Sequence, residues 1–334
     1  MSIPLLQCCP GTLAEGFTTY SPSCLRAMFS GKKVTHILPY APPQQSEWVA
    51  NAFIENRTRI SISGVQEKLS LLLEKNQLRL TNKGESGTYL LKPIPRDLKQ
   101  VDQVPANEHL TMQIAKQVYG LKTAENALIF FENGSPTYIT KRFDVKADGT
   151  HWGKEDFATL AGKSKGNVGA EFKYNYSYEE IGQLIQEYVP AWRVEIEKYF
   201  LLVLFNFLYS NGDAHLKNFS LLESPKGDYV LSPAYDLINT NLHADDTDFA
   251  LDKGLFADGH KSGDYLKNGH PSKNDFKTFA LRIGVANARI EKLMQPFLDR
   301  QPKMEALVAR SFLEPSNQRG YIFRYNTKRN YLVG

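Results

Sequence analysis

The chain has 334 residues, of which 42% are hydrophobic and 23% charged, the balance of a soluble globular protein with room for two lobes. Its formal net charge of +4 gives no indication of a nucleic-acid-binding protein, which would need clustered basic residues. The three cysteines, Cys8, Cys9 and Cys24, include an adjacent pair, which argues against a disulfide framework and favours reduced cytosolic thiols.

The first residues lack the basic and apolar regions of a signal peptide. The longest apolar run, 199–209, is shorter than the ~20 residues that span a bilayer. We therefore expect a cytoplasmic protein with no membrane partner. Residues 1–55, rich in Pro, Ser and Gly, form an N-terminal segment of unknown role, with one short helix at 22–29 and a turn or linker at 39–43.

Between residues 56 and 144 the residue pattern predicts strands with one helix among them. Strands are expected at 60–63, 68–73, 77–80, 88–92, 127–131 and 137–140, and the helix follows Pro105, with Leu110, Ile114, Ala115 and Val118 on one face. Residues 132–136 (ENGSP) carry a strong hairpin signal. This part of the chain predicts an α+β unit with an antiparallel sheet.

From residue 145 to 334 the chain is predicted to be mainly helical. Helices are expected at 155–160, from the capping box at 177–180 to about 188, and at 191–210, 273–283, 287–299 and 302–312. A loop covers 163–176, and a β-ribbon is expected at 219–222 and 229–231. A small sheet-rich lobe before a larger helical lobe is the layout of a protein kinase, with ATP expected in the cleft between them.

Residues 211–218 (NGDAHLKN) directly follow the apolar helix, in which Asn206 is the one polar interruption of the run 199–209. A polar turn in that place is costly to fold unless it has a function. Asp213 and Asn218 have the spacing of the kinase catalytic loop H-R-D-x-x-x-x-N, in which Asp accepts the substrate hydroxyl proton and Asn holds Mg²⁺. The preceding His-Arg is missing here. We expect Asp213 to be the catalytic base and Asn218 a metal ligand.

A second metal-binding acid should follow, and Asp236 in SPAYD is the candidate, with the adjacent Tyr235 expected at the nucleotide. His215 either orients the catalytic turn and contacts phosphate or makes a structural hydrogen bond. Lys217 is expected to neutralise charge that develops on the transferred group.

Lys92 ends the expected strand 88–92, and Glu108 lies in the first turn of the next helix. Kinases place a strand lysine on the ATP phosphates and hold it with a helix glutamate. Alone, such residues are more often exposed surface charges, but their order before Asp213 favours the catalytic interpretation.

Residues 61–68 (SISGVQEK) lie between two expected strands, where a phosphate-covering loop belongs. Backbone N–H groups in such a turn form an anion nest. The candidate nucleotide contacts are Ser63, Gly64, Val65, Gln66 and Lys68, although one glycine also fits a plain β-turn. At 141–144 (KRFD), Lys141 and Phe143 are candidate adenine contacts of a hinge, or belong to a plain linker.

Two further charged stretches are less informative. Residues 245–248 (DDTD) are expected to be a solvated loop. The basic and aromatic stretch 319–329 either contacts RNA or an acidic partner or, as we favour, is a solvated surface tail.

These motifs together resemble the HipA-like serine/threonine kinases, the toxins of bacterial toxin–antitoxin systems. The resemblance is carried by 61–68, 91–93 (LKP), 107–108 (NE), 141–144, 211–218 and 234–236 (AYD). Ser61 and Ser63 beside the glycine are most similar to the HipT type of the three-gene HipBST arrangement. The short segment before the core favours the same type, because HipA carries an extra N-terminal subdomain that is a separate protein, HipS, in those systems.

The resemblance implies an ATP- and Mg²⁺-dependent kinase that phosphorylates a serine of an aminoacyl-tRNA synthetase, glutamyl for HipA and tryptophanyl for HipT. It also implies autophosphorylation at Ser61, with Ser63 as a second site. A phosphate there would add roughly −1.5 to −2 charge and repel ATP. The implied partners are a HipB-like helix-turn-helix antitoxin, through which DNA is contacted indirectly, and a HipS-like small protein.

Two other functions stay open. One is a catalytically silent kinase-fold binding module that sequesters a partner, although the presence of every metal and phosphate group argues against it. The other is a small-molecule kinase on the same fold.

Overall fold

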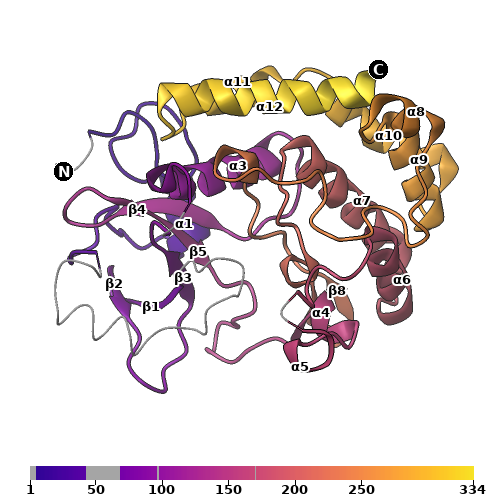
Figure 1. Ribbon diagram of the computed structural model, residues 1–334. Helices are drawn as coiled ribbons and strands as arrows, with labels where there is room; N and C mark the ends of the chain where they lie inside the picture. Colours follow the sequence, from indigo (N-terminus) through magenta and orange to yellow (C-terminus); the bar gives the residue numbers. More distant parts are fainter. Residues whose placement is uncertain (1–4, 43–67, 96–97, 170) are drawn as a thin grey trace. The chain divides into compact units, whose positions relative to one another are not determined.

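The computed structural model describes residues 5–42, 68–95, 98–169 and 171–334 (Figure 1). The chain forms two compact units. The first comprises residues 1–114, 124–151 and 306–318, and the second comprises 115–123, 152–305 and 319–334.

The first unit is built on a five-stranded antiparallel sheet with the strand order β2-β1-β3-β5-β4. Its strands are β1 (Leu69–Glu74), β2 (Gln77–Leu80), β3 (Tyr89–Lys92), β4 (Asn126–Phe130) and β5 (Pro136–Lys141). These five strands confirm the predicted ones to within one or two residues, and β4 and β5 pair through the predicted hairpin. The strand expected at 60–63 lies outside the described residues.

The N-terminal segment is part of the core of this unit. The short predicted helix is present as α1 (Pro22–Phe29), and Phe29 is fully buried in one apolar cluster with sheet residues such as Leu71 and Leu91. The Tyr89 hydroxyl donates to the Met28 carbonyl oxygen at 2.8 Å. Residues 36–38 also lie along the edge strand β4, where the Leu38 N–H donates to the Phe130 carbonyl oxygen at 2.7 Å. Residues 5–42 of this segment therefore pack onto the sheet rather than standing apart from it.

The helix expected after Pro105 is α3 (Val104–Gln117), preceded by the short 3₁₀ helix η1 (Val101–Gln103). Leu110, Ile114 and Ala115 are buried as predicted. Several polar residues of α3 are buried as well, and each has an internal partner, as for Gln113, whose side chain donates to Asn126 at 3.0 Å. The buried surface of α3 is therefore wider than the one apolar face that the sequence indicates.

The second unit is mainly helical and carries a three-stranded antiparallel sheet in the order β6-β7-β8. Its strands are β6 (Lys154–Asp156), β7 (Ser220–Glu223) and β8 (Tyr229–Leu231). The other helices of the described residues are α4 (Phe157–Leu160), α5 (Lys165–Val168), α6 (Tyr178–Tyr188), α7 (Trp192–Leu208), α8 (Gly263–Asn268), α9 (Lys273–Arg282), α10 (Asn287–Leu298), α11 (Pro302–Ala309) and α12 (Pro315–Val333), with the 3₁₀ helices η2 (Leu216–Asn218) and η3 (Thr240–Leu242).

Two local predictions in this unit are wrong in part. The helix expected at 155–160 begins only at Phe157, because Asp156 ends β6 and accepts a hydrogen bond from the Thr159 N–H as the N-cap of α4. The loop expected at 163–176 contains one short helix, α5. The capping box at Ser177 and Glu180 is confirmed at the start of α6.

The stretch 319–329 is not a solvated tail, so that prediction is wrong. It forms most of α12, in which Tyr321 and Tyr325 are buried and lie 6.0 and 5.4 Å from the Tyr209 ring centroid. Tyrosines four positions apart share one face of a helix, which lets both rings pack inward while Phe323 remains exposed.

The expectation for 245–248 holds only in part. Asp245 and Thr247 are exposed, but Asp248 forms an ion pair with Lys328 of α12, and Asp246 is half-buried.

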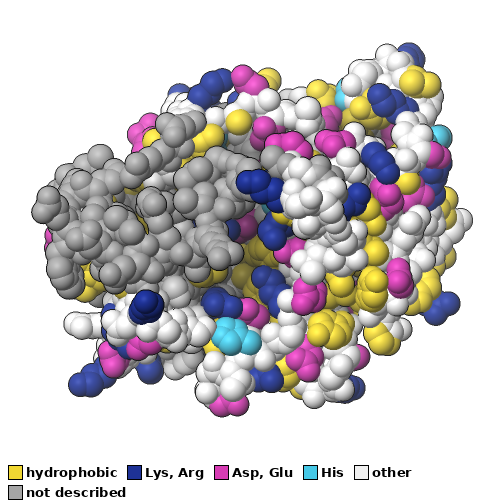
Figure 2. All heavy atoms as spheres, turned by 60° about the horizontal axis from the view of Figure 1, so that its bottom comes forward, with side chains coloured by type: hydrophobic (Ala, Val, Ile, Leu, Met, Phe, Trp, Pro, Cys, Tyr) yellow, Lys and Arg dark blue, Asp and Glu magenta, His cyan; other side chains and the backbone are white. Residues whose placement is uncertain are grey.

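Charges of both signs are interspersed over the described residues of the face drawn in Figure 2. This mixture agrees with the small net charge of the chain. Among the described residues, none of the helices combines the length and the hydropathy that crossing a bilayer requires.

Candidate active site

The turn 211–218 is anchored to the end of α7. The backbone leaves the helix through Ser210, which has a positive φ of 52°. The Asn211 N–H donates to the Asn206 carbonyl oxygen at 2.8 Å, and the Asn211 side chain donates to Asn206 Oδ1 at 2.9 Å. Asn206, the polar interruption of an apolar helix, therefore holds the first residue of the turn.

A second anchor comes from the segment that follows Asp236. The Thr240 hydroxyl accepts from the Gly212 N–H at 2.9 Å and donates to the Ser210 carbonyl oxygen at 3.0 Å. Gly212 lies so close to the neighbouring loop that a Cβ atom there would be 2.5 Å from the Cβ of Asp246. A glycine is therefore required at position 212 to admit this loop.

Asn218 and Asp236, the two predicted metal ligands, are adjacent. Asn218 Nδ2 donates to Asp236 Oδ2 at 3.2 Å. Asp236 has a positive φ of 56°, a conformation that is uncommon outside glycine and that gathers at functional sites. The amide oxygen of Asn218, Oδ1, is buried and has no hydrogen-bond partner among the residues that the structure describes.

This arrangement fits a hard cation. Mg²⁺ takes oxygen ligands, uses one or two protein groups, and completes its shell with water and nucleotide phosphates. Asn218 Oδ1 is a buried acceptor that lacks a donor, and the Asp236 carboxylate lies beside it. Over the described parts of the chain, three or more His, Cys, Asp or Glu side chains nowhere gather into a metal site. Asn218 and Asp236 are the one or two protein groups that a magnesium ion completed by water and phosphate needs.

Asp213 lies within reach of groups from the turn itself and from the preceding loop. The Tyr174 hydroxyl donates to Asp213 Oδ1 at 2.9 Å, and His215 Nε2 is 3.8 Å from the same oxygen. Partial burial raises the pKa of Asp213 above its ordinary value; the charge of Lys173 and the Tyr174 hydrogen bond oppose this shift in pKa. The side chain keeps 41% of its surface exposed, which leaves the carboxylate accessible to a substrate hydroxyl.

His215 and Lys217 contact different neighbours. The His215 ring is buried and packs edge-on against the Tyr174 ring, with centroids 5.3 Å apart. Lys217 Nζ forms an ion pair with Asp156 Oδ2 at 2.7 Å. The Tyr235 hydroxyl donates to the Lys217 carbonyl oxygen at 2.9 Å, so Tyr235 supports the turn as well as flanking Asp236.

In the first unit, Lys92 and Glu108 form an ion pair, with 2.5 Å between Nζ and Oε1. Their side chains are 5% and 2% exposed, so these are not the surface charges that such residues usually are. Lys92 is further held by β3, whose partner β5 contributes the Tyr138 ring at 5.2 Å from Nζ.

The other predicted nucleotide contacts are only partly described. Lys68 is half-buried immediately before β1, whereas Ser61, Ser63, Gly64, Val65 and Gln66 lie outside the described residues. The Lys141 N–H donates to the Glu125 carbonyl oxygen at 2.8 Å, so an adenine contact at Lys141 would use another of its groups. Arg142 and Asp144 of the same motif form an ion pair at 2.6 Å, which orders the stretch around Phe143.

Three residues at this site were missed by sequence reasoning: Lys173, Tyr174 and Asp246. Tyr174 is 39 positions from Asp213, and Asp246 was assigned to a solvated loop. None of the three belongs to a spacing motif, so their contacts with Asp213 are visible only in the fold.

An α+β protein with an Asp–Asn–Asp set and a buried strand-Lys–helix-Glu pair has the elements of a kinase-like fold. A sequence profile of the HipA-like C-terminal domain family matches residues 60–304, most of the chain, and the chain therefore belongs to this family.

Two relatives illustrate the extent of the similarity. A putative kinase of Haemophilus influenzae is 26% identical over 312 residues, which cover 90% of this chain and 88% of the relative. The serine/threonine-protein kinase toxin HipA of Shewanella oneidensis is 25% identical over 205 residues, which cover 57% of this chain and 46% of that protein. The chain thus spans about half the length of the second relative.

Two solved structures share the fold. One is HipA of Shewanella oneidensis MR-1 in complex with HipB and operator DNA, with a TM-score of 0.61 and 19% identity over 81% of this chain and 63% of that chain. The other is the proinflammatory kinase CtkA of Helicobacter pylori, with a TM-score of 0.51 and 14% identity over 79% of this chain and 93% of that chain. The predicted α+β, protein-kinase-like fold of the HipA type is confirmed.

Proposed function

We propose that the protein is an ATP- and Mg²⁺-dependent serine/threonine protein kinase that acts as the toxin of a toxin–antitoxin system. The observation that carries the proposal is the buried amide oxygen of Asn218, which lacks a donor among the described residues and lies beside the Asp236 carboxylate. A metal-binding site explains both the orphaned oxygen and the strained backbone of Asp236.

Each residue has a defined task in phosphoryl transfer, which depends on positioning and charge neutralisation. Asp213 accepts the proton of the substrate hydroxyl, and Asn218 with Asp236 would hold Mg²⁺. The metal, when bound, neutralises charge on the nucleotide phosphates. Lys92 binds phosphate and is oriented by Glu108. The Glu108 carboxylate keeps the buried ammonium group charged and in place, which a surface lysine would not need.

We further propose an aminoacyl-tRNA synthetase, tryptophanyl or glutamyl, as the protein substrate, with autophosphorylation at Ser61 and Ser63. The Ser-Ile-Ser sequence supports assignment to the HipT type. The proposed partners are a HipB-like antitoxin, in line with the HipA–HipB complex of the structural relative, and a HipS-like small protein. The protein would act in the cytoplasm, where synthetases work.

The test is radiolabelled ATP with Mg²⁺ and purified bacterial tryptophanyl- and glutamyl-tRNA synthetases, followed by mass spectrometry of labelled peptides. We expect a phosphoserine on one synthetase with the unaltered protein and with Asp264→Asn, an exposed carboxylate of α8. Asp213→Asn should abolish the label. Labelling that persists in Asp213→Asn would refute the assignment of the base, and unlabelled synthetases would refute the substrate.

A labelled bacterial lysate extends the same experiment to other targets. A single protein band supports a protein kinase. Label in small molecules alone would instead favour a small-molecule kinase, and the absence of any Asp213-dependent label would favour a silent binding module.

A further inference from the structure

The loop before α6 runs directly beside the catalytic turn. The Leu216 N–H donates to the Lys173 carbonyl oxygen at 3.1 Å. One residue further along the loop, the Tyr174 hydroxyl donates to Asp213 Oδ1 at 2.9 Å. Backbone and side chain of this loop therefore both contact the turn that carries the base.

Lys173 is a buried lysine, with 3% of its surface exposed. Lysines are almost never buried to this degree unless their charge is compensated. Its Nζ atom lies 4.8 Å from the Tyr174 ring centroid, and its charge acts on the Asp213 carboxylate. The loop thus brings a positive charge close enough to act on the proposed base.

Groups from several segments act on the Asp213 carboxylate. Lys173 and Tyr174, from the loop before α6, favour its ionised form, whereas Asp246 and Asp236, from the stretch that follows β8, disfavour it. His215 of the turn itself is 3.8 Å from Oδ1. Without Lys173, the carboxylate would face two like charges with no comparable attraction from the loop.

We propose that Tyr174, with Lys173 against its ring, is a positioning residue that holds the Asp213 carboxylate correctly oriented for proton transfer. This inference rests on the proposed kinase function. The contacts of Tyr174 and His215 both fall on Oδ1, and we assign Oδ2 to the substrate hydroxyl. A base fixed through one oxygen presents the other in a constant direction, and small displacements of such groups are costly in rate.

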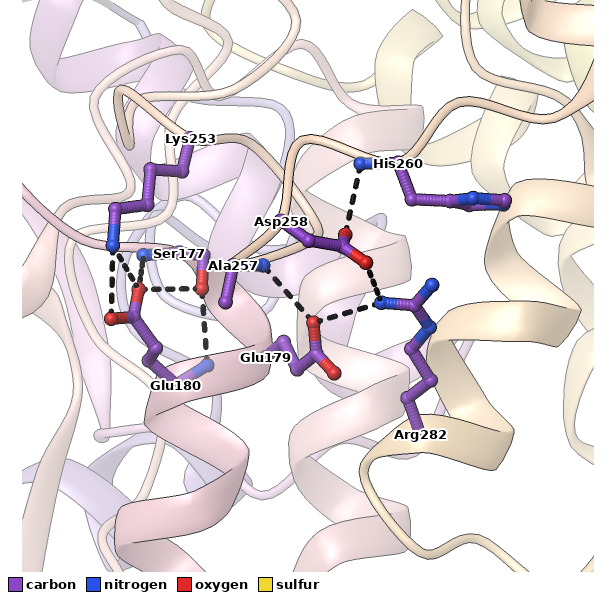
Figure 3. Close-up of polar contacts among 8 residues, drawn as sticks. All are labelled: Ser177, Glu179, Glu180, Lys253, Ala257, Asp258, His260 and Arg282. Atoms are coloured by element: carbon purple, nitrogen blue, oxygen red, sulfur yellow. Dashed lines mark hydrogen bonds and ion pairs between the residues drawn. The ribbon is translucent and has the colours of Figure 1, made fainter.

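The loop is also held by backbone hydrogen bonds to a second segment, and a residue that positions another needs such support. The Asp252 N–H donates to the Tyr174 carbonyl oxygen at 3.0 Å, and the Lys253 N–H to that of Tyr176 at 3.3 Å. Figure 3 shows the Lys253 side chain reaching Glu180, with Nζ–Oε distances of 3.0 and 3.2 Å. The loop is therefore fastened to the segment that follows Asp248.

The same close-up shows that α6 is fixed at its first turn. Ser177 and Glu180 form the capping box, and Glu179 accepts from the Ala257 N–H at 3.0 Å (Figure 3). Arg282 of α9 bridges to Asp258 at 3.0 Å. These bonds fix the helix that directly follows the loop.

The kinetic test uses Lys173→Met and Tyr174→Phe, with the synthetase that the protein labels as substrate. We expect kcat to fall at least about tenfold in Tyr174→Phe, the factor that a hydrogen bond to a charged group represents. We also expect kcat to fall in Lys173→Met, because the Asp213 carboxylate loses a nearby positive charge. The KM for ATP should stay within about twofold, because neither residue is proposed to contact the nucleotide. Lys173→Met combined with Asp246→Asn should recover part of kcat, since one repelling carboxylate is removed.

Matched controls come from the same loop. Lys163 lies over the ring of Tyr176, 5.7 Å from its centroid, much as Lys173 lies over Tyr174. Lys163→Met and Tyr176→Phe should retain the kcat of the unaltered protein. If Lys173→Met and Tyr174→Phe also retain it, the inference is wrong, while the proposed function stands.

A stability measurement tests the contact without relying on activity. Asp213→Asn should raise the Tm more in a Lys173→Met background than in the unaltered protein, because there the carboxylate has lost its counter-charge. Equal effects in the two backgrounds would show that Lys173 and Asp213 do not interact and would overturn the inference. An unaltered protein that transfers no phosphate would instead overturn the proposed function, and with it the catalytic role of the pair.

Discussion

Asn218 donates from Nδ2 to Oδ2 of Asp236 over 3.2 Å, although 18 positions separate the two residues. The bond fixes which way the amide faces, and so leaves Oδ1 as the buried oxygen that lacks a donor among the described residues. In metal sites, a hydrogen bond from a neighbouring side chain fixes the orientation of the residue that binds the metal.

Asn218→Ala should therefore weaken magnesium binding in a way that does not depend on catalysis. We expect Mg²⁺ with a non-hydrolysable ATP analogue to raise the Tm of the unaltered protein, because a ligand that binds the folded state stabilises it. The rise should be much smaller for Asn218→Ala. Asn268→Ala, an exposed asparagine at the end of α8, is the matched control and should behave as the unaltered protein does. An undiminished rise for Asn218→Ala would remove this residue from the metal site.

Lys92→Met should destabilise the protein strongly, since it leaves Glu108 as an uncompensated buried charge. Breaking one side of a buried pair costs about 3–5 kcal/mol. Replacing both residues, in Lys92→Met with Glu108→Met, should restore most of the stability and none of the phosphoryl transfer. Urea unfolding and the synthetase assay measure the two effects separately.

The control for that experiment is an exposed ion pair. Arg289 and Glu197 are 2.8 Å apart, with 46% and 24% of their side chains exposed. Arg289→Met should change the free energy of unfolding by about 0–1 kcal/mol. A comparable loss of unfolding free energy in Lys92→Met and Arg289→Met would contradict the larger contribution that we assign to the buried pair.

Asp213 gives a pH-dependent effect on stability. Its pKa in the folded protein is raised, chiefly by partial burial, so folding favours the protonated carboxyl. Stability should then fall as the pH rises above the unfolded-state pKa of about 3.9, where the unfolded chain ionises first. Asp213→Asn should accordingly be more stable than the unaltered protein at pH 7 without ATP or Mg²⁺. The difference should close as the pH falls below about 4, which Tm measurements across pH would show.

Thiol labelling should separate reactivity from accessibility. Hydrogen bonds from the Cys24 side chain and from the side chain and backbone of Ser21 lower the pKa of the Cys9 thiol to about 4. A thiol pKa this low would by itself indicate a reactive cysteine. Cys9 and Cys24 are nevertheless buried, with 0% and 2% exposure, whereas Cys8 is half-buried. We expect a maleimide to modify Cys8 in the native protein, and all three thiols only after unfolding. Mass spectrometry that found Cys9 labelled first would contradict the buried position.

The parts of the fold that are local in sequence were predictable. The spacing of Asp213 and Asn218 lies within one turn, and the hairpin signal at 132–136 lies between the two strands that it joins, β4 and β5. The capping box of α6 is equally local. In each case the residues that decide the structure are neighbours along the chain.

What escaped prediction depends on distant contacts. The buried face of α12 was hidden because basic residues surround Tyr321 and Tyr325 in sequence, and only packing against Tyr209 shows which side is covered. Tyr174 stands in a polar loop, and nothing in its neighbours indicates that it reaches Asp213. The start of α4 was misplaced because Asp156 serves both a strand and a helix cap, and the partner strand is far along the chain.

The burial of α1 has a practical consequence for the choice of truncated forms of this protein. The family match begins at residue 60, yet Phe29 and Cys24 lie in the same apolar cluster as Leu71 and Leu91 of the sheet. A fragment that begins at residue 60 would lack α1, so the apolar side chains of the sheet that α1 buries would be exposed to water. Such a truncated protein is expected to aggregate during purification. A loss of activity in it would therefore not identify a catalytic residue.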